Sequence, residues 1–125
     1  MREIKFRAWD KVDEVMREVL KIDFDIKVVW LLKYINGEKR AYELEFDDIE
    51  LIEFTGLHDK NNVEIYEGDI VKIFDENYEV KIITTNSECF VDYGYPDEHN
   101  GPTPNWVEVI GNIWENKELL EVKNE

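Results

Sequence analysis

A β-hairpin pattern in the first half of the chain limits most strongly what this sequence can fold into. Residues 28–35, VVWLLKYI, are mostly β-branched and aromatic, as strands prefer. Asn36-Gly37 follows, and this dipeptide is the strongest short signal for a tight hairpin turn. The return segment, residues 40–46, reads RAYELEF and alternates apolar and polar side chains. Because alternate residues of a strand face opposite sides, we expect an antiparallel pair with one apolar face.

The rest of the chain repeats short alternating segments separated by turn residues. A turn is expected at residues 75–77, and residues 96–105, which hold all three prolines, are expected to form a surface loop. Asn116 is the expected N-cap of a short helix that runs to about Val122. Further strands are expected at residues 4–9, 49–54, 70–74, 78–85, 88–95 and 106–114.

Residues 14–26 fit two different patterns. A helix would gather apolar residues on one side, and a strand would place apolar residues in one alternating row. The helical set is Val15, Met16, Val19 and Leu20, and the strand set is Met16, Leu20, Ile22, Phe24 and Ile26. We favour the strand, because the alternation continues through Ile26.

These patterns predict a mainly β fold. The expected form is a short-stranded sandwich or a small SH3-like barrel built from hairpins, with a short C-terminal helix. With 125 residues, the chain fits a single domain, residues 1–125. Its halves also fit two β subdomains that meet near residue 54, although no linker composition separates them.

Charge is the strongest feature of the composition. Thirty acidic residues against fifteen basic ones leave a formal net charge of −15. Such a surface repels phosphate groups, which disfavours direct nucleic-acid binding and binding to anionic membranes. The single cysteine, Cys89, cannot form an internal disulfide, and we find neither a secretory pattern nor an apolar run long enough to span a membrane. We therefore expect a soluble cytoplasmic protein.

Residues 55–71, TGLHDKNNVEIYEGDIV, are the first place to look for chemistry. His58 stands beside Asp59, but neighbouring residues tend to point apart, and Cys89 lies in an alternating segment typical of buried, inert thiols. The segment departs from a calcium-binding loop at three positions, and the two histidines lack the spacing of a zinc site. We therefore expect no catalytic, metal or cofactor-binding residues.

A structural interpretation suits the same segment better. Asp59, Asn61 and Asn62 are turn-forming residues, and Asn62 tolerates a left-handed backbone. Gly68 and Asp69 are expected to bend the chain before the next strand. These five residues are the expected fold-defining turn.

Aromatic residues give a hint of a partner surface. Tyr93, Tyr95 and Trp106 flank the proline-rich loop, and such side chains suit protein interfaces. They equally suit a role in holding the loop against the fold, which is the interpretation that we favour.

Three blocks of the sequence resemble the YopX family of phage and prophage proteins. They are residues 1–10, MREIKFRAWD, residues 46–72, FDDIELIEFTGLHDKNNVEIYEGDIVK, and residues 109–121, VIGNIWENKELLE. The family usually has Asn-Gly where this chain has Asn61-Asn62, and often a proline where it has Lys117. The resemblance implies a mainly β fold, a phage or prophage gene in a bacterial host, and homo-oligomerisation as one way in which the protein could act. It implies no activity and no binding residue.

Three functional hypotheses follow. The first is a non-enzymatic accessory protein that acts by binding another, unidentified protein or by self-assembly. The second is an acidic inhibitor that imitates nucleic acid and occupies a DNA-binding protein. The third is a small enzyme of unknown reaction that uses paired carboxylates such as Glu67 and Asp69, which would share one face of a strand. The first is favoured, because no catalytic constellation is visible.

Overall fold

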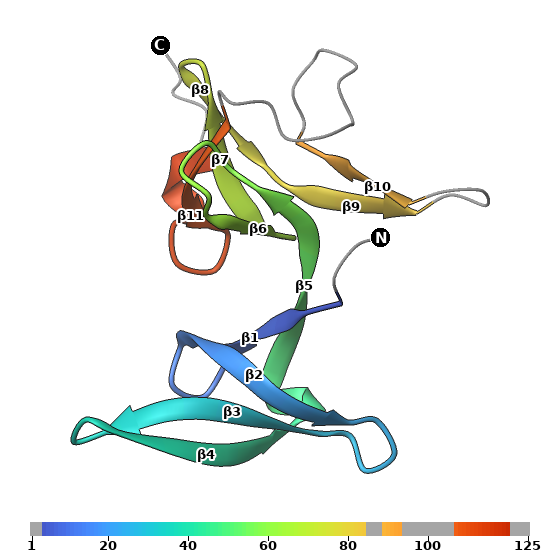
Figure 1. Ribbon diagram of the computed structural model, residues 1–125, viewed down its shortest axis with the longest axis vertical. Coiled ribbons are helices and arrows are strands. Elements are labelled where there is room, and N and C mark those ends of the chain that lie inside the picture. The colour runs from blue at the N-terminus through green and yellow to red at the C-terminus, as the bar shows by residue number, and fades with distance from the viewer. Residues whose placement is uncertain (1–3, 85–88, 94–106, 121–125) are drawn as a thin grey trace. The chain divides into compact units, whose positions relative to one another are not determined.

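The computed structural model describes residues 4–84, 89–93 and 107–120, and its regular structure is almost entirely β (Figure 1). The mainly β prediction is confirmed. In chain order the elements are β1 (Phe6–Asp10), β2 (Val15–Asp23), β3 (Val28–Ile35), β4 (Glu38–Glu45), the 3-10 helix η1 (Phe46–Asp48), β5 (Ile49–His58), β6 (Glu64–Tyr66), β7 (Asp69–Ile73), β8 (Glu76–Glu79), β9 (Lys81–Thr84), β10 (Cys89–Asp92), β11 (Val107–Asn112) and the 3-10 helix η2 (Lys117–Leu120).

The chain divides into two compact units within β5. The N-terminal unit is Lys5–Glu53, and the C-terminal unit holds the described residues from Phe54 onward together with Ile4. The boundary thus lies next to residue 54, where the sequence suggested a division. The strands form open antiparallel sheets, and the described residues do not close into a barrel.

The N-terminal unit is a sheet in the order β4-β3-β2-β1-β5. Its tightest turn is Asn36-Gly37, with φ values of 52° and 81°, which are the left-handed values of a type I′ turn. The predicted hairpin is therefore confirmed, with β3 and β4 paired from Val28↔Glu45 to Ile35↔Glu38. One face of this sheet buries Ala8, Val29, Leu31 and Ile49.

Residues 15–23 form a strand, as favoured, but the predicted apolar row is wrong. The register between β2 and β3 slips between Val19 and Lys21, so the two halves of β2 present residues of opposite parity to the core. Val19 and Ile22 therefore pack against the same cluster. Three members of the predicted row are instead exposed: Leu20 by 48%, Phe24 by 65% and Ile26 by 61%.

The C-terminal unit contains a three-stranded sheet in the order β11-β7-β8, the pair β10-β9, and β6 against the second half of β5. One buried apolar cluster of this unit consists of Ile65, Val71, Ile73, Val80, Val91, Tyr93 and Val107.

Residues 78–85, predicted as one strand, change sheets at Val80. The N–H of Val80 donates to the carbonyl of Asp69 at 2.8 Å, and its carbonyl accepts from the N–H of Gly68 at 2.9 Å. These two bonds hold Val80 beside the start of β7, and β9 follows in a different sheet. The preceding turn lies at Phe74-Asp75 and not at residues 75–77, and Phe74 takes a left-handed φ of 59° there.

The expected C-terminal helix is only a single 3-10 turn in the part of the chain that the structure describes. Asn116 begins it, since its carbonyl accepts from the N–H of Leu119 at 2.9 Å. The side-chain amide of Asn77 donates to the carbonyl of Leu119 at 2.9 Å and holds this turn against β8. Within the described ranges, no helix is both long enough and apolar enough for a membrane crossing.

Gly68 packs directly against the ring of Trp114 in the C-terminal unit. Its φ is +83°, and a methyl group added there would lie 2.3 Å from Cη2 of the Trp114 ring. The carbonyl of Gly68 accepts from the N–H of Ile113 at 2.9 Å, so the backbone on both sides of the Trp114 contact is held. Only a residue without a side chain fits without displacing the indole.

Gly68→Ala tests this close packing. We expect it to lower the free energy of unfolding by about 3 kcal/mol, because a left-handed alanine costs about 1–2 kcal/mol and overpacking about 1–3 kcal/mol more. Gly37→Ala is the matched control: its φ is +81°, but no atom lies within 4 Å of an added methyl group. Equal losses for the two variants in urea unfolding would contradict the proposed steric contact with Trp114.

Candidate partner-binding site

The carboxylate of Asp59 organises the segment that first suggested chemistry. One oxygen, Oδ1, accepts from the backbone N–H groups of Asn61 at 2.8 Å and Val63 at 2.9 Å. The other, Oδ2, accepts from the N–H of Val109 on β11 at 2.8 Å. Asn62 has a φ of 64°, the left-handed value that Asn tolerates. The side chain thus closes its own turn and attaches it to a strand 50 residues away.

The surrounding bonds join the same two segments. The N–H of Lys60 donates to the carbonyl of Val107 at 2.9 Å. Asp69 is 1% exposed and its Oδ2 accepts from the N–H of Tyr66 at 2.8 Å. Asp69 pairs with Asn112 across β7 and β11. Asp59, Gly68 and Asp69 therefore lie where the second and third family-like blocks of the sequence pack together, while Asn61 and Asn62 form the exposed turn that Asp59 closes.

His58 and Asp59 do not act on each other as a catalytic pair would. The imidazole of His58 makes an edge contact with Phe54 at 5.7 Å between ring centroids, while the oxygens of Asp59 bind backbone N–H groups. Burial by itself raises the pKa of Asp59. The three N–H donors, led by Val109, outweigh that effect and hold the pKa below its usual value. A carboxylate that stays ionised and accepts three N–H groups is a poor general base.

A second polar cluster lies in the N-terminal unit. The hydroxyl of Tyr42 donates to Oδ2 of Asp10 at 2.6 Å and accepts from Nε of Arg17 at 3.0 Å. Oδ1 of Asp10 accepts from the N–H groups of Val12 and Asp13. Asp10 is 1% exposed, so these bonds compensate the burial of its charge.

The pKa values of this cluster move away from neutrality. Burial, followed by the hydrogen bond to Asp10, raises the pKa of Tyr42 to about 12. Burial also raises the pKa of Asp10, but the hydroxyl of Tyr42 and the two backbone donors outweigh it and leave the pKa lowered. Acid–base catalysts work best with a pKa near the working pH, so this cluster suits a structural role.

Tyr93 is not available for the predicted partner surface. It is 3% exposed and belongs to the core of the C-terminal unit. A phenol ring buried among Val91 and Val107 offers no area to a partner. Tyr95 and Trp106 lie outside the described residues, and their part in such a surface stays a prediction.

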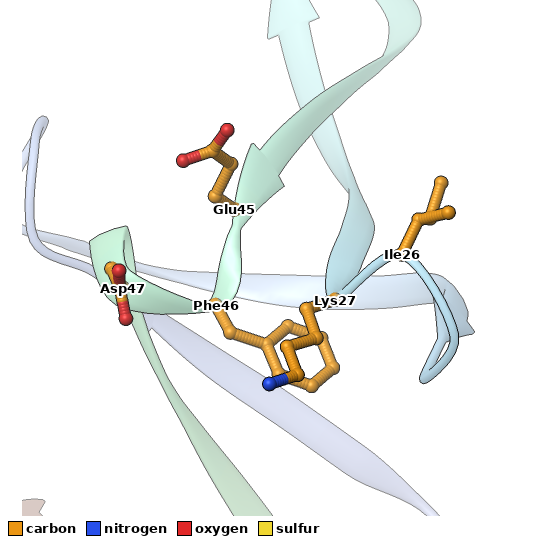
Figure 2. A pocket seen from close by; sticks show the side chains of 5 residues that line it. All are labelled: Ile26, Lys27, Glu45, Phe46 and Asp47. Carbon is orange, nitrogen blue, oxygen red and sulfur yellow. The ribbon is translucent and has the colours of Figure 1, made fainter.

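A different surface combines exposed apolar side chains with carboxylates. Two adjoining hollows, of about 220 Å³ and 440 Å³, lie where the turn before β3 meets the end of β4 and η1. Figure 2 shows the side chains that line the smaller one. Both are open to solvent and share Ile26 and Glu45. We call them together the acidic edge groove; its lining residues are Ile26, Lys27, Val28, Glu43, Leu44, Glu45, Phe46, Asp47 and Asp48.

Local geometry explains how apolar side chains come to line this groove. Oδ1 of Asp23 accepts from the N–H groups of Asp25 and Ile26, which turns the chain after β2. The N–H of Phe46 donates to the carbonyl of Lys27 at 3.0 Å and holds η1 against that turn. The ring of Phe46 then meets the ring of Phe24 edge-on at 5.9 Å. Phe24 and Ile26 remain more than half exposed beside it.

The rim of the groove is acidic. Its lining residues include four carboxylates, Glu43, Glu45, Asp47 and Asp48, against one cation, Lys27. All four carboxylate residues are exposed. The sequence showed Glu43 and Glu45 facing outward, but it placed Phe24 and Ile26 in a core row and so missed the groove. The detectable signal was that every charged residue from Glu43 to Asp48 is acidic.

Taken together, the open sheets and the division within β5 place the chain among small, two-unit β proteins. The family model described as YopX protein matches residues 5–121. The chain therefore belongs to the YopX family, which confirms the resemblance. The crystal structure of protein EF1440 from Enterococcus faecalis is similar over 97% of this chain and 100% of that chain, with 28% sequence identity and a TM-score of 0.63. No curated protein matches the chain.

Asp59→Asn tests the role of the carboxylate in the C-terminal unit. At pH 7 we expect a loss of about 1–3 kcal/mol in unfolding free energy, because a charged acceptor of three N–H groups is replaced by a neutral amide. The pKa of Asp59 is lowered in the folded state, so its stabilisation is present at neutral pH and is lost as the pH falls below about 4. The difference between the two proteins should therefore shrink between pH 5 and pH 2. The exposed Asp75→Asn is the control; a loss of the same size there would contradict the prediction.

Tyr42→Phe tests the cluster around Asp10. We expect a loss of about 1–2 kcal/mol at pH 7, since the carboxylate of Asp10 loses a buried donor. The pKa of Tyr42 is raised to about 12, so its contribution is complete below pH 10 and disappears as the pH rises toward 12. Unfolding free energies at pH 7, 10 and 11.5 measure this, with the exposed Tyr34→Phe as control. A difference that stayed constant across this range would contradict the assigned hydrogen bond.

Proposed function

We propose that the protein is a non-enzymatic accessory protein of phage or prophage origin, which works in the bacterial cytoplasm by binding a basic segment of another protein. The acidic edge groove is the observation that carries this proposal. It combines exposed Ile26 and the half-buried Val28, Leu44 and Phe46 with four exposed carboxylates, and exposed Phe24 lies beside it against Phe46. The phage origin rests on membership of the YopX family.

Exposed apolar area supplies the affinity for such a partner. Phe24 is 65% exposed and Ile26 is 61% exposed. A bound partner would bury apolar surface of both side chains. Burial of apolar surface contributes roughly 25 cal/mol per Å² before the cost of association is subtracted. Two such neighbours beside a concave surface suit an apolar anchor residue of a partner.

The carboxylates determine which partners fit. Glu43, Glu45, Asp47 and Asp48 repel acidic surfaces, and the net charge of −15 does so at longer range. A segment that carries Lys or Arg around an apolar residue matches both features of the groove. Complementary charge chiefly raises the association rate and the specificity, and its effect weakens with salt.

The nucleic-acid-mimic hypothesis is a narrower form of this proposal. It requires the basic partner to be a DNA-binding protein whose nucleic-acid site is occupied. The feature that favours this hypothesis is that the exposed carboxylates of residues 43–50 gather on one segment. Competition by duplex DNA for the partner would distinguish this form from a partner that uses a surface unrelated to nucleic acid.

A defined peptide tests the proposal. The probe is a fluorescent eight-residue peptide of alternating lysine and leucine, with an alternating glutamate–leucine peptide as its negative counterpart. We expect the lysine peptide to bind at low salt, and the double variant Glu43→Gln/Glu45→Gln to weaken it about tenfold, because two exposed ion pairs contribute up to about 1 kcal/mol each. Fluorescence anisotropy at 50 and 300 mM salt measures the affinity.

Glu14→Gln/Glu118→Gln is the matched control, since it removes the same charge from exposed residues outside the groove. An equal loss of affinity in the control would show a general charge effect and no site. Failure of the lysine peptide to bind at all would remove the proposal.

A further inference from the structure

Strand β4 is the free edge of the sheet of the N-terminal unit among the described residues. Only β3 pairs with it there, through eight residue pairs from Val28↔Glu45 to Ile35↔Glu38. Six of the eight residues of β4 are exposed, the exceptions being Tyr42 and Leu44. A strand edge presents backbone donors and acceptors that another extended segment can pair with.

The hairpin turn determines which backbone groups of β4 face outward. In the type I′ turn at Asn36-Gly37, the N–H of Glu38 points to the carbonyl of Ile35 on β3. Direction alternates along a strand, so the N–H and C=O groups of the odd-numbered residues point away from β3. These residues are Lys39, Ala41, Glu43 and Glu45.

The acidic edge groove adjoins this edge. Glu43, Leu44 and Glu45 line the larger hollow together with Val28 of β3, which pairs with Glu45 on the side away from the free edge. The hollow therefore extends over the hairpin toward β3. The outward N–H and C=O groups of Glu43 and Glu45 belong to two of its lining residues, so a segment paired with the edge would place side chains beside the hollow.

We propose that the basic segment binds as an added β-strand on the edge of β4. This inference rests on the proposed function and specifies how the partner is recognised. Side chains of the added strand that share a face with Glu43 and Glu45 would be Lys or Arg. Those that share the opposite face with Tyr42 and Leu44 would be apolar. The partner is therefore a segment in which basic and apolar residues alternate.

The charge pattern of β4 supports a basic partner over a neutral one. The edge carries Lys39 and Arg40 near the turn, and Arg40 is engaged by Glu38 at 2.9 Å. From residue 43 onward, the charged positions of β4 and η1 are all acidic. Charged edges oppose indiscriminate strand pairing, so a segment of complementary charge is favoured selectively.

Ala41→Pro tests strand addition directly. Proline removes an N–H that points away from β3, and proline is tolerated at such edge positions. We expect the alternating lysine–leucine peptide to bind at least tenfold more weakly, while Ala41→Val, which keeps the N–H, binds within threefold of the unaltered protein. The circular dichroism spectrum and urea midpoint of both variants establish that the sheet remains folded.

A second measurement needs no change to the protein. The same peptide is made with N-methyl groups either on all its lysines or on all its leucines. In an added strand only one of the two sets of N–H groups faces β4, so one methylated peptide should lose at least tenfold in affinity and the other less than threefold. Equal effects of the two would overturn strand addition and leave the groove as a side-chain site. A peptide of the same composition arranged with helical spacing should bind more weakly than the alternating one, and equal binding would likewise overturn it.

Amide hydrogen exchange distinguishes pairing of β4 with the peptide from pairing of β4 with a second copy of the chain. Addition of the peptide should slow exchange at Ala41 and Glu43. Slow exchange at these amides without peptide, lost on dilution of the protein, would instead show that β4 pairs with another copy, and it would overturn the proposal. If no lysine peptide binds to the unaltered protein, the proposed function itself fails, an outcome distinct from each of these.

Discussion

The C-terminal unit depends on the carboxylate of Asp59, which accepts hydrogen bonds from two segments far apart in the chain. Asp59 reaches the N–H groups of Asn61 and Val63 within its own turn, and also the N–H of Val109 on β11. A buried charge is costly, but three backbone donors compensate it and make the arrangement specific. Gly68 completes the contact between the segments, since only its missing side chain admits the ring of Trp114. The second and third family-like blocks therefore pack against each other in the folded unit.

The N-terminal unit holds its buried carboxylate in the same manner, by hydrogen bonds. Asp10 is bonded by the hydroxyl of Tyr42 and by backbone N–H groups, and it contributes no accessible charge. The exposed carboxylates that follow Tyr42 stand beside exposed Phe24 and Ile26. Scattered surface charge favours solubility, and exposed Phe24 and Ile26 are the apolar area that the proposed partner would cover.

Much of the fold was predictable from local patterns. The Asn36-Gly37 turn needs left-handed backbone at two positions, and that dipeptide is suited to both, so the hairpin followed from two residues. The strand at residues 15–23 was favoured correctly, but its bulge between Val19 and Lys21 was not predictable from alternation alone. The slip turns Leu20 outward, whereas Phe24 and Ile26 are exposed because they lie in the turn after β2, which Asp23 closes. The candidate site was missed because the alternation was extended past Asp23 into that turn.

The sequence by itself determined where strands begin to alternate, where tight turns fall, and that the surface is strongly acidic. These properties are local or additive, since they depend on side-chain type and spacing. Only the tertiary structure decided that the chain passes from one sheet to another at Val80 and that Tyr93 is buried. It also decided that the acidic residues between positions 43 and 48 adjoin the turn before β3. Each of these depends on pairing between residues far apart in the chain, and the free energy of such pairing is a property of the assembled sheet.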